Sequence, residues 1–192
     1  MAETFTEVAA RSIAVYELRQ VTDKVYYIDC PAKIGVCLLD GGQILLVDSG
    51  SDKDAGKKAL KHLDANGWAL KSVFNTHSHA DHIGGSKLIA DRTGVPVYAP
   101  EIESAFTNWP ELEPSFLYGG YPPAIFRNKF LQAQPCSTLD SYVMELPAGF
   151  ERIPLPGHSF RMEGLRTPDV VVFLSDCLSG ATIVEKDHVI FI

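Results

Sequence analysis

Residues 25 to 99 alternate between short β-rich runs and helical segments, and this alternation constrains the fold more than any other feature of the chain. The β-rich runs are VYYIDC (25–30), GVCLL (35–39), QILLVDSG (43–50), SVFNT (72–76) and VPVYA (95–99). The first three are separated by short turns, which predicts an antiparallel meander. We expect one helix over about 51–66 and another over about 83–93. Strand, helix and strand in this order predict a βαβ unit and an α/β fold.

Residues 100–147 differ from the preceding part of the sequence in composition and periodicity. The stretch NWPELEPSFLYGGYPPAIF is rich in proline and aromatic residues and has little periodicity. A long ordered loop of this kind predicts a lid or pocket wall inserted into the domain. Strands are expected again afterwards at YVMEL (142–146), FERIPL (150–155), VVVFLS (170–175) and HVIFI (188–192).

The final run is hydrophobic and ends the sequence without a turn or charged tail. An unpaired hydrophobic strand of this kind would be a sticky sheet edge, so we expect it to pair within a sheet. It also favours pairing between two copies of the chain as a homodimer. We therefore interpret residues 1–192 as one domain that is truncated at its C-terminus, the N-terminal portion of a longer enzyme.

Composition excludes several function classes. The net charge of −7 leaves no basic surface for nucleic acid or an anionic membrane. The apolar runs are far shorter than the roughly 20 residues of a membrane span, and the N-terminus lacks an apolar signal core. Four cysteines without a C-x-x-C pair predict reduced thiols and a cytoplasmic location.

The sequence THSHADH (76–82) follows a strand and precedes a helix. Side chains two apart in an extended segment share a face, so His77 and His79 can hold one ion together. Asp81 and His82 come where the chain turns into the helix and can serve a second ion. Imidazole and carboxylate ligands suit zinc first, with manganese or iron as alternatives.

Two later strand ends carry matching residues. His158 follows Pro156-Gly157, and Asp176 follows a hydrophobic strand. His158 can supply a third nitrogen to the first ion, and Asp176 can supply an oxygen shared by both ions.

These motifs, together with LLVDSG before the first helix, resemble the metallo-β-lactamase-fold hydrolase superfamily. The resemblance runs from about Val25 to Asp176. It implies a four-layer αββα sandwich, with its second half incomplete in this chain, and a dinuclear metal site at one edge of the two sheets.

Carried over by residue, the resemblance implies that His77, His79 and His158 bind the first metal. Asp81 and His82 would bind the second, and Asp176 would bridge the two. Asp48 would lie behind these ligands and orient them through hydrogen bonds. The family also has a later histidine on the second metal. His188 is the sole candidate here and stands too close to Asp176, so we interpret it as structural and expect the second site to be incomplete.

We therefore predict a metal-dependent hydrolase that uses a metal-bound hydroxide on a small ester, thioester, lactone, amide or phosphodiester. Asp81 is the predicted catalytic residue, orienting the nucleophile and moving a proton. The substrate should be a small molecule, with an apolar wall formed by Trp109, Phe116, Tyr118, Tyr121 and Phe126.

Hydroxyacylglutathione hydrolysis is not favoured, because Ser159-Phe160 follows His158 where such enzymes often carry a second histidine. Two alternatives stay open. One is a mononuclear iron oxidoreductase resembling persulfide dioxygenases, which use the first site alone. The other is a metal-binding module whose catalysis is impaired by the missing histidine.

Overall fold

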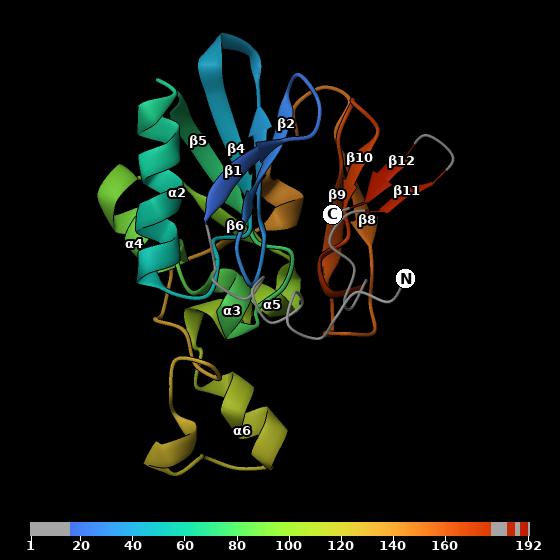
Figure 1. Ribbon diagram of the computed structural model, residues 1–192. Coiled ribbons are helices and arrows are strands. Elements are labelled where there is room, and N and C mark those ends of the chain that lie inside the picture. Colours follow the sequence, from blue (N-terminus) through green and yellow to red (C-terminus); the bar gives the residue numbers. More distant parts are fainter. Residues whose placement is uncertain (1–15, 178–183, 187–188, 192) are drawn as a thin grey trace, which may run out of the picture.

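The computed structural model describes residues 16–177, 184–186 and 189–191. In these residues a first sheet has seven strands in sequence order (Figure 1). They are β1 (Glu17–Gln20), β2 (Val25–Asp29), β3 (Ile34–Leu38), β4 (Gln43–Val47), β5 (Ala69–Phe74), β6 (Val97–Ala99) and β7 (Leu139–Asp140). Strands β1 to β4 pair antiparallel and β4 to β7 pair parallel. The predicted meander and βαβ unit are both confirmed, and a short 3-10 turn (η2, Asp40–Gly42) joins β3 to β4.

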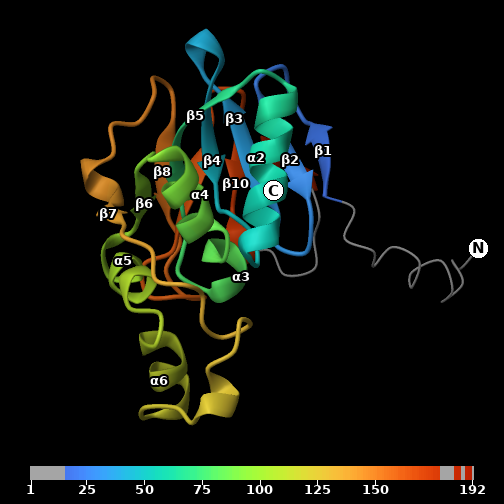
Figure 2. The same ribbon diagram turned by 90° about the vertical axis from the view of Figure 1, so that its left-hand side faces the viewer.

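Helix α2 (Lys53–Ala65) connects β4 to β5, close to the expected range. The Asp52 side chain accepts the backbone N–H groups of Asp54 and Ala55, both at 3.0 Å, and so caps the start of the helix. The apolar face of α2 packs on the first sheet with Ala55, Ala59 and Leu63 buried. Figure 2 shows α2 and α4 (Ser86–Thr93) in front of this sheet.

The helix expected over 83–93 is confirmed as α4 from Ser86 to its end at Thr93, but its start is wrong, because a separate short helix, α3 (Ala80–Ile83), precedes it. Gly84 and Gly85 separate them. A Cβ on either glycine would collide with the backbone of Ser49 or Ser51 at the end of β4. The two glycines therefore allow a close approach of backbones, which places α3 directly against the β4–α2 connection.

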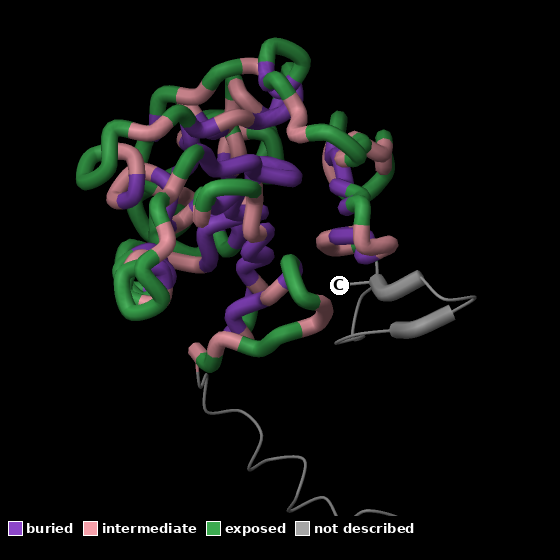
Figure 3. Tube along the Cα trace, turned by 90° about the horizontal axis from the view of Figure 1, so that it is seen from above, coloured by how far each residue is buried: buried purple, intermediate pink, exposed green. Residues whose placement is uncertain are grey.

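The second sheet has the order β11-β12-β10-β9-β8. Its strands are β8 (Glu151–Pro154), β9 (Glu163–Arg166), β10 (Val171–Phe173), β11 (Val184–Lys186) and β12 (Val189–Phe191). The two sheets pack through a common core that includes Cys37, Leu45 and Phe74 from the first and Leu165 and Phe173 from the second. The buried residues gather inside these layers in Figure 3.

The predicted α/β sandwich is confirmed in three layers: helices α2 and α4, the first sheet and the second sheet. In the part of the chain that the structure describes, no helix covers the outer face of the second sheet (Figure 1).

The inserted segment 100–147 is more regular than its sequence predicts. It contains α5 (Glu101–Asn108), α6 (Leu112–Tyr118) and a short 3-10 helix, η3 (Ala124–Phe126). The segment around α6 projects away from the sheets (Figure 1). The strand expected over 142–146 is wrong: a 3-10 turn, η4 (Ser141–Val143), occupies its first half because the Asp140 side chain accepts the Tyr142 backbone N–H at 2.9 Å.

All four cysteines are free thiols; Cys30, Cys37 and Cys136 are buried and Cys177 is exposed. Within residues 16–177 and the two short C-terminal strands, no helix combines the length and apolar character needed to cross a bilayer.

Candidate metal centre

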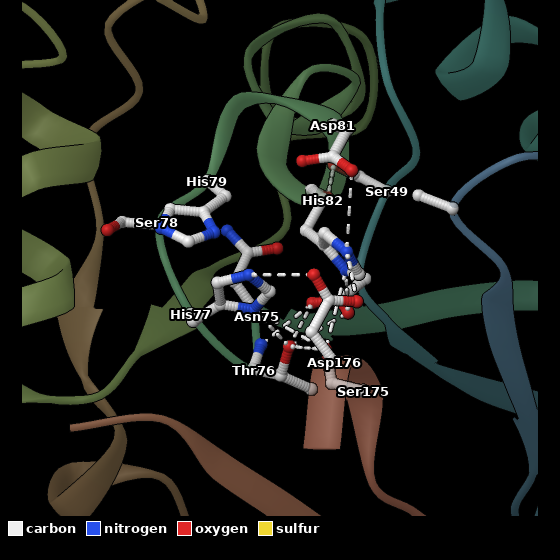
Figure 4. A network of polar contacts seen from close by, with 12 residues as sticks. Ser49, Asn75, Thr76, His77, Ser78, His79, Asp81, His82, Ser175 and Asp176 are labelled. Atoms are coloured by element: carbon white, nitrogen blue, oxygen red, sulfur yellow. Dashed lines mark hydrogen bonds and ion pairs between the residues drawn. The ribbon is translucent and has the colours of Figure 1, made fainter. Parts of the chain in front are cut away.

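Chain segments that are distant in sequence meet at one edge of the two sheets (Figure 4). Asp48 directly follows β4, and the segment from Asn75 to His82 follows β5. Because β4 and β5 are parallel, their carboxyl ends lie at the same edge. The loop between β8 and β9 brings His158 to this edge, and the turn η5 (Ser175–Cys177) after β10 brings Asp176.

The structure brings together four of the predicted ligands. One ligand atom each from His77, His79, His158 and Asp176 lies within 4.8 Å of all the others. His158 Nε2 is 2.9 Å from His79 Nδ1 and 3.1 Å from Asp176 Oδ2. His77 Nε2 is 4.0 Å from the same carboxylate oxygen. The alternation that places His77 and His79 on one face of the segment is thus realised.

The second nitrogen of His77 is held by a hydrogen bond from behind. His77 Nδ1 lies 3.0 Å from the Thr76 hydroxyl, whose own hydrogen can reach Asp48 Oδ2 at 2.9 Å. This series of hydrogen bonds assigns the proton of His77 to Nδ1 and leaves Nε2 with a free lone pair. His77 Nε2 is buried and has no hydrogen-bond partner among the described residues.

His82 lies on the other side of Asp176. Its Nδ1 is 2.8 Å from Asp48 Oδ2, and its Nε2 is 3.2 Å from Asp176 Oδ1. Asp48 is almost fully buried and also accepts the Thr76 backbone N–H at 2.7 Å. Asp48 therefore stands behind the ligand loop and orients both His82 and Thr76, the arrangement that the family resemblance implies.

Asp81 is a predicted ligand that the structure does not place in the cluster. It lies outside the group formed by His77, His79, His158 and Asp176, and its side chain is 55% exposed. The distance from Asp81 Oδ2 to His82 Nε2 is 3.7 Å. Asp81, His82 and the second oxygen of Asp176 thus line a neighbouring, more open position. His188 lies outside the described residues.

The charges in this cluster differ sharply between neighbouring histidines. Burial alone would lower the pKa of His82, but the Asp48 carboxylate and hydrogen bonds to Asp176 and Asp48 raise it to about 10. Burial, followed by the proximity of His82 and His79, lowers the pKa of His77 to about 2. The hydrogen bond from His82 holds the pKa of Asp176 well below its usual range. His77 is therefore a neutral imidazole, the form that binds metal.

The backbone is strained at two residues beside the ligands. Asp48 and Ser175 adopt left-handed conformations with φ of 62° and 50°. Such conformations in non-glycine residues cost on the order of 1–3 kcal/mol and are concentrated at functional sites. The Ser175 hydroxyl lies 2.9 Å from the Thr76 hydroxyl, so both strained residues belong to one hydrogen-bonded network.

The inserted segment adds two acidic residues that the sequence did not point to. Glu113 Oε1 of α6 lies 3.5 Å from His79 Nε2, the nitrogen that faces away from the cluster. Burial raises the pKa of Glu113. Glu103 of α5 hydrogen-bonds Ser78, between His77 and His79. No periodicity or motif connects these residues to THSHADH, because the contacts depend on how the insert folds.

The donor set fits a divalent cation. Ligand atoms about 2.1 Å from a tetrahedral zinc lie about 3.4 Å from one another. The separations of 2.9, 3.1 and 4.0 Å observed here scatter around that value. A cation would also give the orphaned His77 Nε2 a partner. Three imidazoles and a carboxylate suit zinc, and they also suit manganese or iron.

Residues 33–171 match the family model described as the metallo-beta-lactamase superfamily. This range covers well over half of the chain and contains THSHADH and His158. The chain belongs to the metallo-beta-lactamase superfamily.

Curated relatives match over shorter segments. A hydroxyacylglutathione hydrolase of Erythrobacter litoralis is 42% identical over 71 residues, which is 34% of this chain and 28% of that protein. A probable metallo-hydrolase, YybB, of Bacillus subtilis is 30% identical over 105 residues, which is 51% of this chain and 47% of that protein. The matched segments thus span between about a quarter and a half of these relatives.

Solved structures share the fold at low identity. A metallo-beta-lactamase with a HARLDQ motif from Cronobacter sakazakii superposes with a TM-score of 0.64 and 14% identity, covering 90% of this chain and 70% of that chain. The subclass B3 metallo-beta-lactamase BJP-1 of Bradyrhizobium japonicum gives a TM-score of 0.58 and 19% identity, covering 95% and 62%. These likenesses support the fold.

Proposed function

We propose that the chain is a metal-dependent hydrolase whose cation is held by His77, His79, His158 and Asp176. The observation that carries the proposal is the convergence of their ligand atoms within 4.8 Å, with the buried His77 Nε2 lacking any other partner in the described residues. Relatives named as hydroxyacylglutathione hydrolase and metallo-hydrolase support hydrolysis over the iron oxidoreductase and the inactive binding module.

A divalent cation in this position supplies Lewis acidity and lowers the pKa of a water molecule towards neutrality. The residues of the chain provide the rest. Thr76 holds the proton of His77 on Nδ1, and Asp48 holds a proton on Nδ1 of His82. Asp81, half exposed in the first turn of α3, can accept a proton from the attacking water and pass it to the leaving group.

An apolar surface adjoins this centre. The rings of Phe106, Phe116 and Phe160 contact one another, with the centroids of Phe116 and Phe160 4.9 Å apart. Phe160 is two residues beyond His158, and Phe116 is one helical turn beyond Glu113, which contacts His79. Phe116 and Phe160 are 59% and 45% exposed. We propose that this aromatic cluster holds the apolar part of a small substrate.

The reacting group is proposed to be an ester, thioester, lactone, amide or phosphodiester. The sequence around Ser159 disfavours hydroxyacylglutathione, whereas the 71-residue match to a hydrolase of that name favours it. The substrate test therefore includes this thioester. We propose zinc as the cofactor and a cytoplasmic setting, which the unpaired thiols support.

The test uses the full chain, stripped of metal and reloaded with zinc, manganese or iron. Turnover is measured on a panel with one ester, a hydroxyacylglutathione thioester, a lactone, an amide, a β-lactam and a phosphodiester. We expect metal-dependent hydrolysis of at least one class, lost in His77→Ala and kept in His62→Ala, which alters a histidine of α2 outside the cluster.

Tight metal binding without hydrolysis of any panel member would contradict the proposed hydrolase and favour the binding module. Oxygen uptake with a persulfide by the iron-loaded protein alone would favour the oxidoreductase. Equal turnover in His77→Ala and the unaltered chain would remove the proposed site.

A further inference from the structure

We propose that Glu103 of helix α5 is a positioning residue for the metal site. Its carboxylate ties the loop that carries His77 and His79 to the loop that carries His158, so that the three imidazoles converge before any ion binds. The inference rests on the proposed function, because it takes the histidine cluster to be a metal site.

Each oxygen of Glu103 serves one of the two loops. Oε2 accepts the backbone N–H of Ser78 at 3.1 Å and the Ser78 hydroxyl at 2.6 Å. Oε1 accepts the Ser159 hydroxyl at 2.8 Å and the Arg161 backbone N–H at 2.8 Å. Glu103 is 1% exposed, so these hydrogen bonds lie out of water.

Glu103 contacts residues that are adjacent in sequence to the proposed ligands, on the side away from the metal position. Ser78 stands between His77 and His79, and successive side chains in an extended segment point to opposite faces. In Figure 4 the Ser78 side chain accordingly points away from Asp176, towards which the two imidazoles turn. Ser159 directly follows His158. Movement of either loop relative to the other must therefore break hydrogen bonds to one carboxylate.

Because this carboxylate is buried, its hydrogen bonds hold the two loops together strongly. A buried carboxylate needs hydrogen-bond donors, and hydrogen bonds to a charged acceptor are about twice as strong as neutral ones. The two loops belong to different sheets, since one follows β5 and the other joins β8 to β9. Glu103 thus joins the two sheets at the edge where the ligands meet.

This role assigns the inserted segment a function besides its predicted one as a lid or pocket wall. Helix α5 begins directly after β6 and packs against β6 and β7, which fixes Glu103 near the start of the helix. Groups that orient metal ligands from behind typically change metal affinity 10- to 100-fold when they are altered.

The test compares Glu103→Gln with Glu101→Gln, an exposed residue of the same helix. A glutamine at 103 keeps the shape of the side chain but turns an NH₂ group towards one pair of donors, and this releases one loop. Zinc affinity of the metal-free protein is measured by competition with a chromophoric chelator, well below the unfolding temperature of each variant. We expect at least tenfold weaker binding for Glu103→Gln and unchanged binding for Glu101→Gln.

A purely structural role would lower the unfolding temperature but leave the affinity of the folded protein unchanged. The absorption spectrum of the cobalt-loaded protein separates the two, because it reports ligand geometry. Unchanged affinity together with an unchanged cobalt spectrum in Glu103→Gln would overturn the inference.

If Glu103→Gln does not fold, Ser159→Ala and Ser78→Ala each remove one hydroxyl donor and serve instead. We expect both to weaken zinc binding, and wild-type affinity in both would overturn the inference. Absence of zinc binding by the unaltered chain would refute the proposed function itself, and this inference with it. Tight binding by the unaltered chain and by Glu103→Gln refutes the positioning role alone.

Discussion

Replacing Asp48 by asparagine tests how one buried carboxylate sets the protonation of His82. Asp48 Oδ2 lies 2.8 Å from His82 Nδ1, and Oδ1 accepts the Thr76 backbone N–H at 2.7 Å. A carboxylate only accepts hydrogen bonds, so His82 keeps a proton on Nδ1 when a metal displaces the proton of Nε2 and binds its lone pair. An asparagine that retains the bond from Thr76 turns its NH₂ group towards His82 and makes Nδ1 the acceptor.

The size of the effect follows from this one reversed hydrogen bond. To bind a metal through Nε2, His82 must then carry its proton on Nδ1 again. The Nδ1–H and the asparagine NH₂ group would face each other, and a buried donor left without an acceptor costs about 1–3 kcal/mol. That cost corresponds to roughly 5- to 150-fold in affinity. We expect the ion contacted by His82 to bind about 10- to 100-fold more weakly. The ion held by His77, His79 and His158 should be affected less, because Asp48 reaches His77 only through the Thr76 hydroxyl, which can still donate to the Oδ1 atom of an asparagine.

The assay is a zinc titration of metal-free protein that resolves a tight and a weaker binding step. Asp91→Asn, which alters an exposed residue of α4, is the control. The reasoning is refuted if Asp48→Asn leaves both steps unchanged or weakens both equally.

Further predictions concern packing, pH and metal binding. Gly35→Ala should lower the free energy of unfolding by about 1–3 kcal/mol in urea titrations, because a Cβ would lie 2.5 Å from the Phe173 ring; an unchanged midpoint would contradict the close contact. Burial raises the pKa of Glu163, whose carboxylate accepts the Ser141 hydroxyl. A raised pKa in the folded state means that stability falls as pH rises through it, so the wild type should lose stability relative to Glu163→Gln between about pH 4 and 7; parallel urea curves at both pH values would contradict this. Binding of the zinc ion contacted by His82 should release a proton, measured by calorimetry in different buffers near pH 7, because Asp48 raises the pKa of His82 to about 10 and an imidazole must be neutral to bind; binding without proton release would contradict it.

Part of the candidate metal site could be predicted because the positions of some of its residues follow from short-range geometry. Alternation places His77 and His79 on one face, and the carboxyl ends of β4 and β5 bring Asp48 to the same edge. His158 and Asp176 were candidates from their places at strand ends, and the family resemblance supported their joining the same site, since no local rule sets how two sheets pack. Asp81 illustrates the limit, because its place in the first turn of α3 leaves it half exposed beside His82.

The helices of the inserted segment were not predicted, because the stretch is rich in proline and aromatic residues and has little periodicity. Pro100 precedes the first residue of α5, and Pro114 lies in the first turn of α6. Proline is tolerated in a first turn, where its missing N–H would have no partner in the helix. The role of Glu103 could not be predicted from the sequence either, because its four hydrogen bonds exist only once α5 is in place.

Tertiary contacts also overrode local propensity in the second half. The run 142–146 is rich in strand-forming residues, yet the Asp140 side chain caps a 3-10 turn there and Met144 is buried in the core between the sheets. Strand β9 contains glycine and charged residues and gives little β signal. It forms because β8 and β10 pair with it on both sides.

X-ray absorption at the zinc edge tests the ligand set most directly. For the chain loaded with one equivalent of zinc, we predict nitrogen and oxygen scatterers at about 2.0–2.1 Å, with the multiple-scattering pattern of imidazole rings that weakens in His79→Ala. Sulfur scatterers at about 2.3 Å, or an oxygen-only shell that His79→Ala leaves unchanged, would contradict the assignment of His77, His79, His158 and Asp176 as the metal ligands.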